Sequence, residues 1–97
     1  MMKYDDGWIF MRILLCLWST VNGVTLTDIR RKLGLRVTFR HIDWLEKHRY
    51  VHRVVDLDDV RKINIYLTAK AKPVCKVLMD LRYALPEDLK HGLFGKN

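Results

Sequence analysis

Apolar side chains in the middle of the chain recur at helical spacing and predict a short helix over about residues 26–33. Leu26, Ile29 and Leu33 fall on one side of such a helix, and the basic residues between them fall on its other sides. Gly34 follows directly, and a glycine at this place allows the backbone to leave the helix and turn. The pattern predicts an amphipathic helix with one face toward a core.

The start of this helix carries a separate signal. Thr25 and Asp28 have the three-residue spacing of a capping box. In that motif a hydroxyl accepts one free N–H of the first turn, and a side chain three residues later accepts another. The pair predicts that the helix begins at Leu26.

A second run of apolar positions predicts another helix, over about residues 36–48. Thr38, Ile42 and Leu45 share its inner side, and the opposite side is largely cationic. Two short helices joined by a tight turn that contains a glycine are typical of a helix-turn-helix, in which the second helix is the recognition helix.

Two runs of strand-forming residues follow and predict an antiparallel β-hairpin over about residues 50–67. The first run is rich in β-branched residues, the second alternates apolar and polar positions, and a polar turn separates them. A hairpin placed directly after a helix-turn-helix is a wing. The expected fold is therefore mainly α with a small antiparallel β-hairpin, a winged helix-turn-helix in one domain over residues 1–85.

The first and last helices of this domain, at about residues 7–21 and 69–85, are apolar around most of their circumference. Such helices are buried on more than one side, and in a domain of this size we expect the second side to face another subunit. The alternative is that the two helices cover each other within one chain. Residues 86–97 are expected to form a C-terminal tail. The predicted dimer interface comprises Trp8, Met11, Leu15, Trp18, Val74, Leu78, Leu81 and Leu85.

Charge adds a functional indication. The chain has 18 Lys and Arg against 11 Asp and Glu, a net charge of +7. The excess is concentrated in residues 25–53, the predicted helix-turn-helix. A positive patch of this kind attracts polyanions with strong salt dependence. The residues predicted to contact DNA are Arg30, Arg31, Arg36, Val37, Arg40, His41, Trp44, Lys47, Arg53, Arg61 and Lys62.

The roles of several of these residues differ. Arg36 and Arg40 suit guanine O6 and N7 in the major groove. Trp44 has two readings, a contact with the wing or a partner chain and a contact with a thymine methyl or a sugar. Arg30 and Arg31 either contact phosphate or belong to a solvated helix face.

The tip of the predicted wing is acidic at Asp56, Asp58 and Asp59. Because carboxylates repel phosphate, two arrangements are open. The wing stays off the minor groove, or it contacts DNA only through its basic residues, which are Arg53, Arg61 and Lys62.

Other chemistry is not expected. Cys16 and Cys75 lie in apolar surroundings, as reduced thiols of an intracellular, cytoplasmic protein do. The spacing of Cys and His residues indicates no metal site, and we expect no cofactor and no membrane segment. A phosphate loop and a nucleophile motif are absent from the sequence, so we do not expect an enzyme.

These motifs resemble the winged-helix transcriptional regulators of the MarR, PadR and ArsR kind, small versions of which are common in archaea and their viruses. The resemblance covers about residues 8–85. Residues 25–35 resemble the second helix and turn of the family, residues 40–53 its recognition helix and first wing strand, and residues 66–71 the entry into its dimerising helix. It implies a homodimeric, sequence-specific double-stranded DNA-binding regulator, and it leaves a small-molecule effector open.

The chain departs from the family pattern at three places. The connection between Leu35 and Ile42 is shorter than usual, and Arg49 and Ala71 stand where the family usually has glycine. These departures concern local turn geometry. A second function is also open, a winged-helix module that binds protein through its hydrophobic helices and an exposed Trp44.

Overall fold

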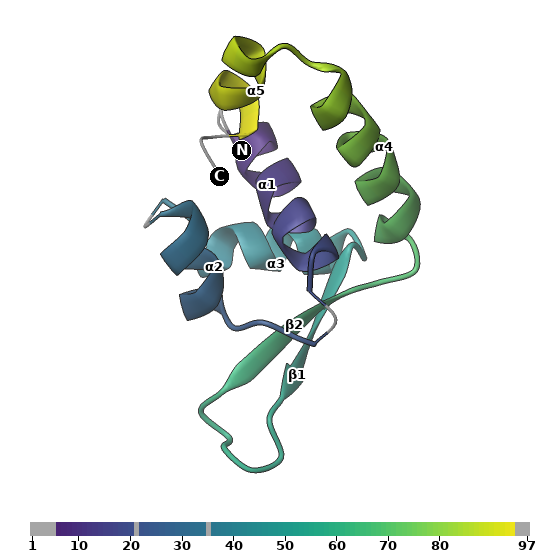
Figure 1. Ribbon diagram of the computed structural model, residues 1–97. Coiled ribbons are helices and arrows are strands. Elements are labelled where there is room, and N and C mark those ends of the chain that lie inside the picture. The colour runs from purple at the N-terminus through teal and green to yellow at the C-terminus, as the bar shows by residue number, and fades with distance from the viewer. Residues whose placement is uncertain (1–5, 21, 35, 95–97) are drawn as a thin grey trace.

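The computed structural model describes residues 6–20, 22–34 and 36–94 (Figure 1). It confirms a mainly helical fold with one two-stranded antiparallel hairpin. The elements in chain order are α1 (Asp6–Trp18), α2 (Leu26–Leu33), α3 (Phe39–Lys47), β1 (Val51–Val55), β2 (Ile63–Leu67), α4 (Ala71–Ala84) and α5 (Glu87–Phe94).

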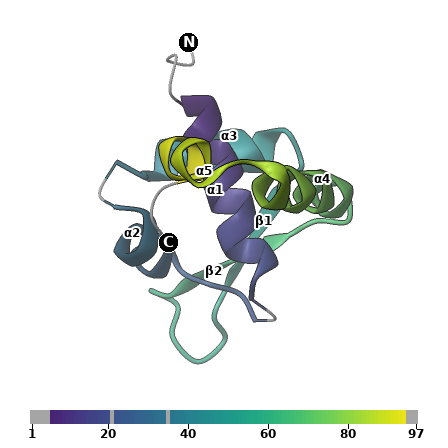
Figure 2. The ribbon, with the colours of Figure 1, turned by 45° about the horizontal axis from the view of Figure 1, so that its top comes forward.

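Helix α1 occupies the centre of the molecule. It contacts α2, α3, α4, α5 and β2. In Figures 1 and 2 it lies between α2 on one side and α4 on the other, with α3 behind it. The apolar circumference of this helix is therefore largely covered within the single chain. This agrees with the alternative given above, in which α1 is covered by other helices of its own chain and not by a second subunit.

The core around α1 contains side chains from most of the helices and from the hairpin. Ile13, Ile29, Ile42, Ile65 and Cys75 come from five different elements and are almost completely buried. Burying one aliphatic side chain of this size contributes roughly 1.5–3 kcal/mol, so these contacts supply much of the stability of the fold.

The boundaries of α2 agree with the sequence signals. The Thr25 N–H donates to Asp28 Oδ2 at 3.1 Å, and the Asp28 N–H donates to Thr25 Oγ1 at 3.2 Å. The hydrogen bond from the Thr25 backbone lowers the pKa of the Asp28 carboxyl. At the other end Gly34 has φ of 102°, a conformation that favours glycine, and its N–H donates to Arg30 O.

Two predicted helix boundaries are wrong. Helix α1 ends at Trp18 rather than residue 21, and the Ser19 and Thr20 hydroxyls donate to carbonyls of its last turn. Helix α3 begins at Phe39 rather than at residue 36 because Thr38 is its N-cap. The Thr38 N–H donates to Nδ1 of His41, which stands where a capping box usually has Glu or Gln.

The expected tail after residue 85 contains helix α5, so that expectation is also wrong. Pro86 directly precedes α5, and its carbonyl accepts the Lys90 N–H at 2.9 Å. Glu87 and Asp88 lie in the first turn, where negative charge is favourable. Pro86 thus both follows the end of α4 and precedes the first turn of α5.

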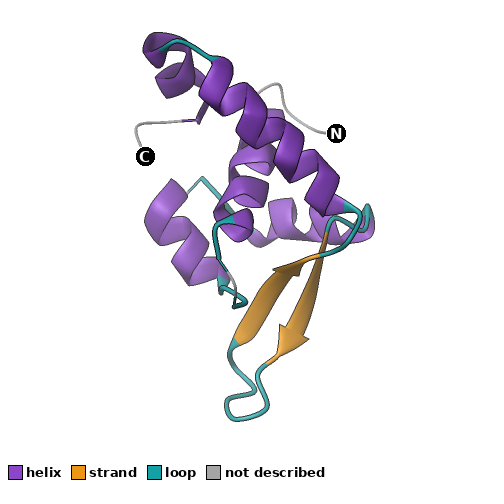
Figure 3. Ribbon diagram, turned by 45° about the vertical axis from the view of Figure 1, so that its right-hand side comes forward, coloured by secondary structure: helices purple, strands orange, loops and turns teal. Residues whose placement is uncertain are grey.

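The hairpin projects from the helices as a wing (Figure 3). Val51 pairs with Leu67 at its base and Val55 with Ile63 further out. Val24, in the loop between α1 and α2, forms an antiparallel bridge to Ile65, with two backbone hydrogen bonds of 3.3 and 2.7 Å. The base of the wing is thus attached to the helical part of the molecule through the main chain.

Arg53 attaches the wing to α3 as well. Its Nη2 lies 2.7 Å from Glu46 Oε1 and 2.9 Å from Asp43 Oδ1, and its backbone N–H donates to Glu46 Oε2. The side-chain hydrogen bond between Arg53 and Glu46 lowers the pKa of the Glu46 carboxyl and raises that of the guanidinium. We call Arg53, Asp43 and Glu46 the wing clamp.

The turn from α3 into β1 contains a strained residue. Arg49 has φ of 68°, in the left-handed region. The Tyr50 N–H donates to Leu45 O at 2.8 Å and the Arg49 N–H to Glu46 O at 3.0 Å, which is the hydrogen-bond pattern of a Schellman motif. The family that this sequence resembles usually has glycine at the position of Arg49. The backbone here has the positive φ that favours glycine, although the residue is arginine.

We predict that Arg49→Gly stabilises the protein by roughly 0.5–1 kcal/mol, because glycine adopts positive φ without the steric cost that arginine bears. Urea denaturation measures the change as a higher midpoint. Lys76→Gly, within α4, is the matched control and should destabilise by about 1 kcal/mol. A lower midpoint for Arg49→Gly would show that the positive φ is not the dominant cost at this turn.

We also predict that Glu46→Gln destabilises the protein by roughly 1 kcal/mol at neutral pH, a modest value because both clamp side chains are partly exposed. The folded-state pKa of Glu46 is lowered, so its contribution is complete above the unfolded value of about 4.3 and is lost as the pH falls through the folded value. The difference between native protein and variant should therefore close in acid.

Thermal unfolding from pH 7 to pH 3 measures that difference. Glu87→Gln is the control, because Glu87 is an exposed carboxylate that pairs only within α5 among the interactions described. A difference that stays constant across this range would contradict an electrostatic role for Glu46.

Candidate nucleic-acid interface

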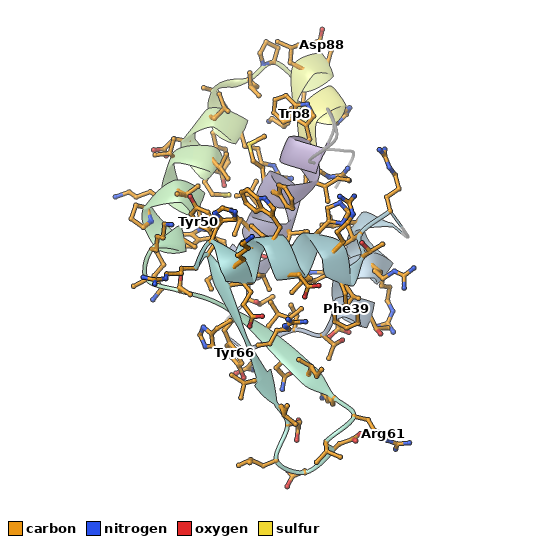
Figure 4. The ribbon with its side chains drawn as sticks, turned by 180° about the vertical axis from the view of Figure 1, so that it is seen from behind. Trp8, Phe39, Tyr50, Arg61, Tyr66 and Asp88 are labelled. Carbon is orange, nitrogen blue, oxygen red and sulfur yellow. The ribbon has the colours of Figure 1, made fainter. Side chains whose placement is uncertain are left out.

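Helix α3 presents a mixed but mainly cationic outer side. Figure 4 shows α3 running across the face seen from behind, with the hairpin below it. Arg40, Asp43 and Lys47 are exposed along the helix, and Arg36 is exposed just before it. Three of these four side chains are positively charged, and one, Asp43, belongs to the wing clamp.

A hollow of about 640 Å³ lies between α2, the start of α3 and the outer part of the hairpin. Its walls carry three cationic side chains, Arg30, Arg61 and Lys62. Among the residues that the structure describes, Asp59 is the one acidic side chain that lines it, and we call it the basic hollow. A groove of this size and charge beside the second helix of a helix-turn-helix can receive a chain of phosphates.

The cations of the basic hollow differ in how they are held. The Arg61 side chain is almost fully exposed and lies 3.5 Å from Asp59. Nε of Arg30 is buried and has no hydrogen-bond partner among the residues that the structure describes. Arg31 does not line the hollow. It lies 3.6 Å from Asp28 on the surface of α2, an exposed pair that contributes little.

The carboxylates of the wing tip build the turn. Asp56 accepts the backbone N–H groups of Asp58 and Asp59, and Asp59 accepts that of Arg61. The first of these hydrogen bonds lowers the pKa of Asp56. Asp56 thus stays negatively charged at neutral pH, and the basic residues Arg61 and Lys62 of the wing line the hollow.

Two residues predicted to contact DNA are part of the core instead. Val37 and His41 are each 2% exposed. The phase of the predicted helix was counted from Arg36, but Val37 precedes the first turn and His41 turns inward to cap the helix and to pack edge-on against Phe10. These two predictions are corrected here.

Trp44 is a third correction. Its indole stacks on Phe10 with ring centroids 4.4 Å apart and lies 4.1 Å from the His48 ring. Tyr50 stacks beyond it, and Lys70 Nζ lies 4.4 Å from the Tyr50 ring centroid. Trp44 therefore joins α3 to α1, and the expectation of an exposed indole is wrong.

Arg53 is engaged in the wing clamp and therefore positions the wing, which differs from the predicted phosphate contact. The structure also reveals a residue that sequence reasoning missed, because Phe39 is 45% exposed and lines the basic hollow. The sequence contains one signal that could have revealed Phe39. Thr38 is a favourable N-cap residue, and a helix that it caps begins at Phe39.

The residues predicted for a dimer interface separate into two groups. Leu15 and Leu78 are buried in the core of the single chain, and Met11 and Leu85 are partly buried against it. These four do not form an open face. The remaining four are more exposed, and they are Trp8, Trp18, Val74 and Leu81.

The outer side of α4 carries a continuous apolar stripe. Val74, Val77 and Leu81 recur at intervals of three and four residues and are all exposed. Val77 was not among the predicted residues. We call these three side chains the α4 stripe.

The two cysteines are free thiols. Burial raises the pKa of Cys75 to about 11 and also raises that of Cys16, so both remain protonated at neutral pH. Within the described part of the chain no group of three or more His, Cys, Asp or Glu residues is placed to hold a metal ion. Over the same part, every helix is too short or too polar to cross a bilayer.

No protein-family model matches the chain, and no curated protein does. Solved structures do match. The transcriptional repressor CouR, bound to a 23-mer DNA duplex, is 29% identical with a TM-score of 0.68, and the match covers 88% of this chain and 61% of CouR.

Two further structures are similar at lower identity. The adhesin competence repressor AdcR from Streptococcus pyogenes has a TM-score of 0.67 at 21% identity, over 84% of this chain and 58% of AdcR. The reduced form of MarR from E. coli has a TM-score of 0.67 at 20% identity, over 88% of this chain and 61% of MarR. The chain thus spans about three fifths of the length of these proteins. It has the winged helix-turn-helix fold of the MarR-family transcriptional regulators.

Proposed function

We propose that this chain is a sequence-specific double-stranded DNA-binding protein that regulates transcription as a homodimer. The observation that carries the proposal is that the basic hollow reaches the exposed start of α3. The same fold binds a DNA duplex in CouR.

The outer side of α3 supplies the reading contacts. A recognition helix lies in the major groove with its N-terminal residues at the base edges. Arg36 and Arg40 are exposed at this end of α3, and a guanidinium donates two hydrogen bonds to O6 and N7 of guanine. Lys47 is at the other end, where a backbone phosphate fits its single charge.

The basic hollow supplies the phosphate contacts. Arg30 enters from α2, and Arg61 and Lys62 enter from the wing, so a phosphate chain between them is approached from two sides. The Arg30 guanidinium can donate charge-assisted hydrogen bonds to an anion in the hollow that it lines. Arg31 takes no part in this arrangement.

The homodimer rests on the α4 stripe. Exposed apolar side chains that line up on one helix mark an interaction surface more often than isolated ones do. A second copy that packs against Val74, Val77 and Leu81 forms the same contact twice around a two-fold axis. Two recognition helices related in this way lie about 34 Å apart and read a palindromic site.

The protein-binding alternative rested on the hydrophobic helices and on an exposed Trp44. That side chain is partly buried, because it stacks on Phe10 and lies at a tilt to the His48 ring. The α4 stripe remains, and the homodimer accounts for it.

DNA binding is tested by electrophoretic mobility shift on random-sequence duplex at graded salt. We predict a linear fall of log K against log salt, with a slope of about −0.9 for each phosphate neutralised. The double variant Arg61→Ala, Lys62→Ala should lower the magnitude of that slope, because both side chains line the basic hollow. Its control is the double variant Lys72→Ala, Lys76→Ala on α4, which removes the same charge elsewhere.

Equal slopes for the two double variants would show that the effect belongs to net charge and not to the hollow. Absence of salt-dependent binding by the native protein would refute the proposed function.

Dimer formation is tested by sedimentation equilibrium in reducing buffer. We predict that Leu81→Lys converts the dimer to a folded monomer of 11.6 kDa and weakens DNA binding, because an ammonium in the α4 stripe cannot be buried against the second copy. Leu57→Lys makes the same change at the fully exposed wing tip and should leave the dimer intact. A native protein that is monomeric at micromolar concentration would remove the dimer and the palindrome from the proposal.

A further inference from the structure

Phe39 is an aromatic side chain that the fold leaves exposed inside the basic hollow. It is the first residue of α3 and is 45% exposed. Its ring lines the same hollow as Arg30, Arg61 and Lys62, and Phe39 is the one residue of α3 among the described residues that line it. In Figure 4 it lies at the end of α3, on the side that faces the hairpin. An apolar ring among cations is not needed to attract phosphate, so it calls for a different explanation.

The position of the ring follows from the way α3 begins. A helical side chain normally covers the turn that precedes it, and the first residue of a helix has no such turn. The Phe39 ring therefore extends beyond the end of the helix. The N-cap interaction between Thr38 and His41 fixes where that end is.

A second contact holds the ring from the wing side. The Arg53 guanidinium carbon lies 6.0 Å from the centroid of the Phe39 ring. Arg53 is itself fixed by Glu46 and Asp43 in the wing clamp. The ring thus has a cation on its wing side and lies where the basic hollow meets the exposed start of α3.

The chemical groups exposed in the major groove determine what such a ring can contact. Most groups on its floor are hydrogen-bond donors or acceptors, and the apolar group is the 5-methyl of thymine. Phenylalanine forms no hydrogen bond, but it packs against that methyl. On the basis of the proposed function, we propose that Phe39 is a specificity-determining residue that selects thymine in the bound sequence through its 5-methyl group.

Other exposed apolar residues do not share this position. Leu57 and Val60 are even more exposed, but they lie at the wing tip among Asp56, Asp58 and Asp59, where phosphate is repelled. The thymine-methyl contact that the sequence suggested for Trp44 is thus assigned to Phe39 instead.

The test uses the full chain and a duplex obtained by binding-site selection with the native protein. Each thymine is replaced in turn by deoxyuridine, which removes the 5-methyl and leaves base pairing intact. At the thymine that Phe39 contacts, we expect the native protein to bind about fourfold more weakly, the factor that corresponds to one buried methyl-sized group.

The same duplexes are then bound by Phe39→Ala. This variant should bind the thymine duplex more weakly than the native protein does, and it should no longer distinguish thymine from deoxyuridine at that position. Phe39→Leu, which keeps an apolar side chain at the helix start, should retain part of the discrimination. Leu57→Ala is the matched control and should discriminate as the native protein does.

The outcomes separate the inference from the function on which it rests. Salt-dependent binding without any deoxyuridine effect overturns the role of Phe39 and leaves DNA binding intact. A deoxyuridine effect that persists in Phe39→Ala also overturns it, because another residue then reads the methyl. Failure to bind any duplex refutes the proposed function itself. Should Phe39→Ala not fold, the deoxyuridine scan with native protein and Phe39→Leu decides.

Discussion

The constraint on which the structure depends is that one helix, α1, has to be covered over most of its circumference. A chain of 97 residues has few elements with which to do this. Helices α2 and α3 cover one part of α1, α4 and α5 cover another, and β2 contributes as well. The helix-turn-helix is therefore not a separate unit placed on a scaffold. Its inward faces are also the walls around α1.

This arrangement explains which parts of the fold were predictable from sequence. Helix α2 is specified by its own residues, through the capping box of Thr25 and Asp28 and through Gly34 at its end. The hairpin is specified by alternation and by a turn that its own carboxylates form. Such local signals lie within a few residues of the elements that they define, so a single sequence is sufficient to find them.

The errors arose where distant contacts decide the outcome. The outer side of α3 was inferred from a helical wheel. The wheel shows that Trp44 lies on the opposite side from Ile42, but it does not show that Phe10 of α1 stacks on Trp44 there. Arg53 was assigned to phosphate because nothing in the sequence indicates that Glu46 and Asp43 would reach it across the turn. A partner from another element changes what a side chain is free to do, and only the tertiary structure supplies that partner.

The two attachments of the wing differ in how they depend on sequence. The clamp needs three particular side chains, and replacing one of them changes the wing contact. The bridge between Val24 and Ile65 uses only backbone N–H and C=O groups, which almost every residue possesses. Because Arg53 pairs with Ile65, both attachments lie at the same level of the hairpin. Mutation of the clamp can thus change how the wing sits against α3 while the main-chain bridge keeps β2 in place, so that the wing can diverge between relatives without loss of the fold.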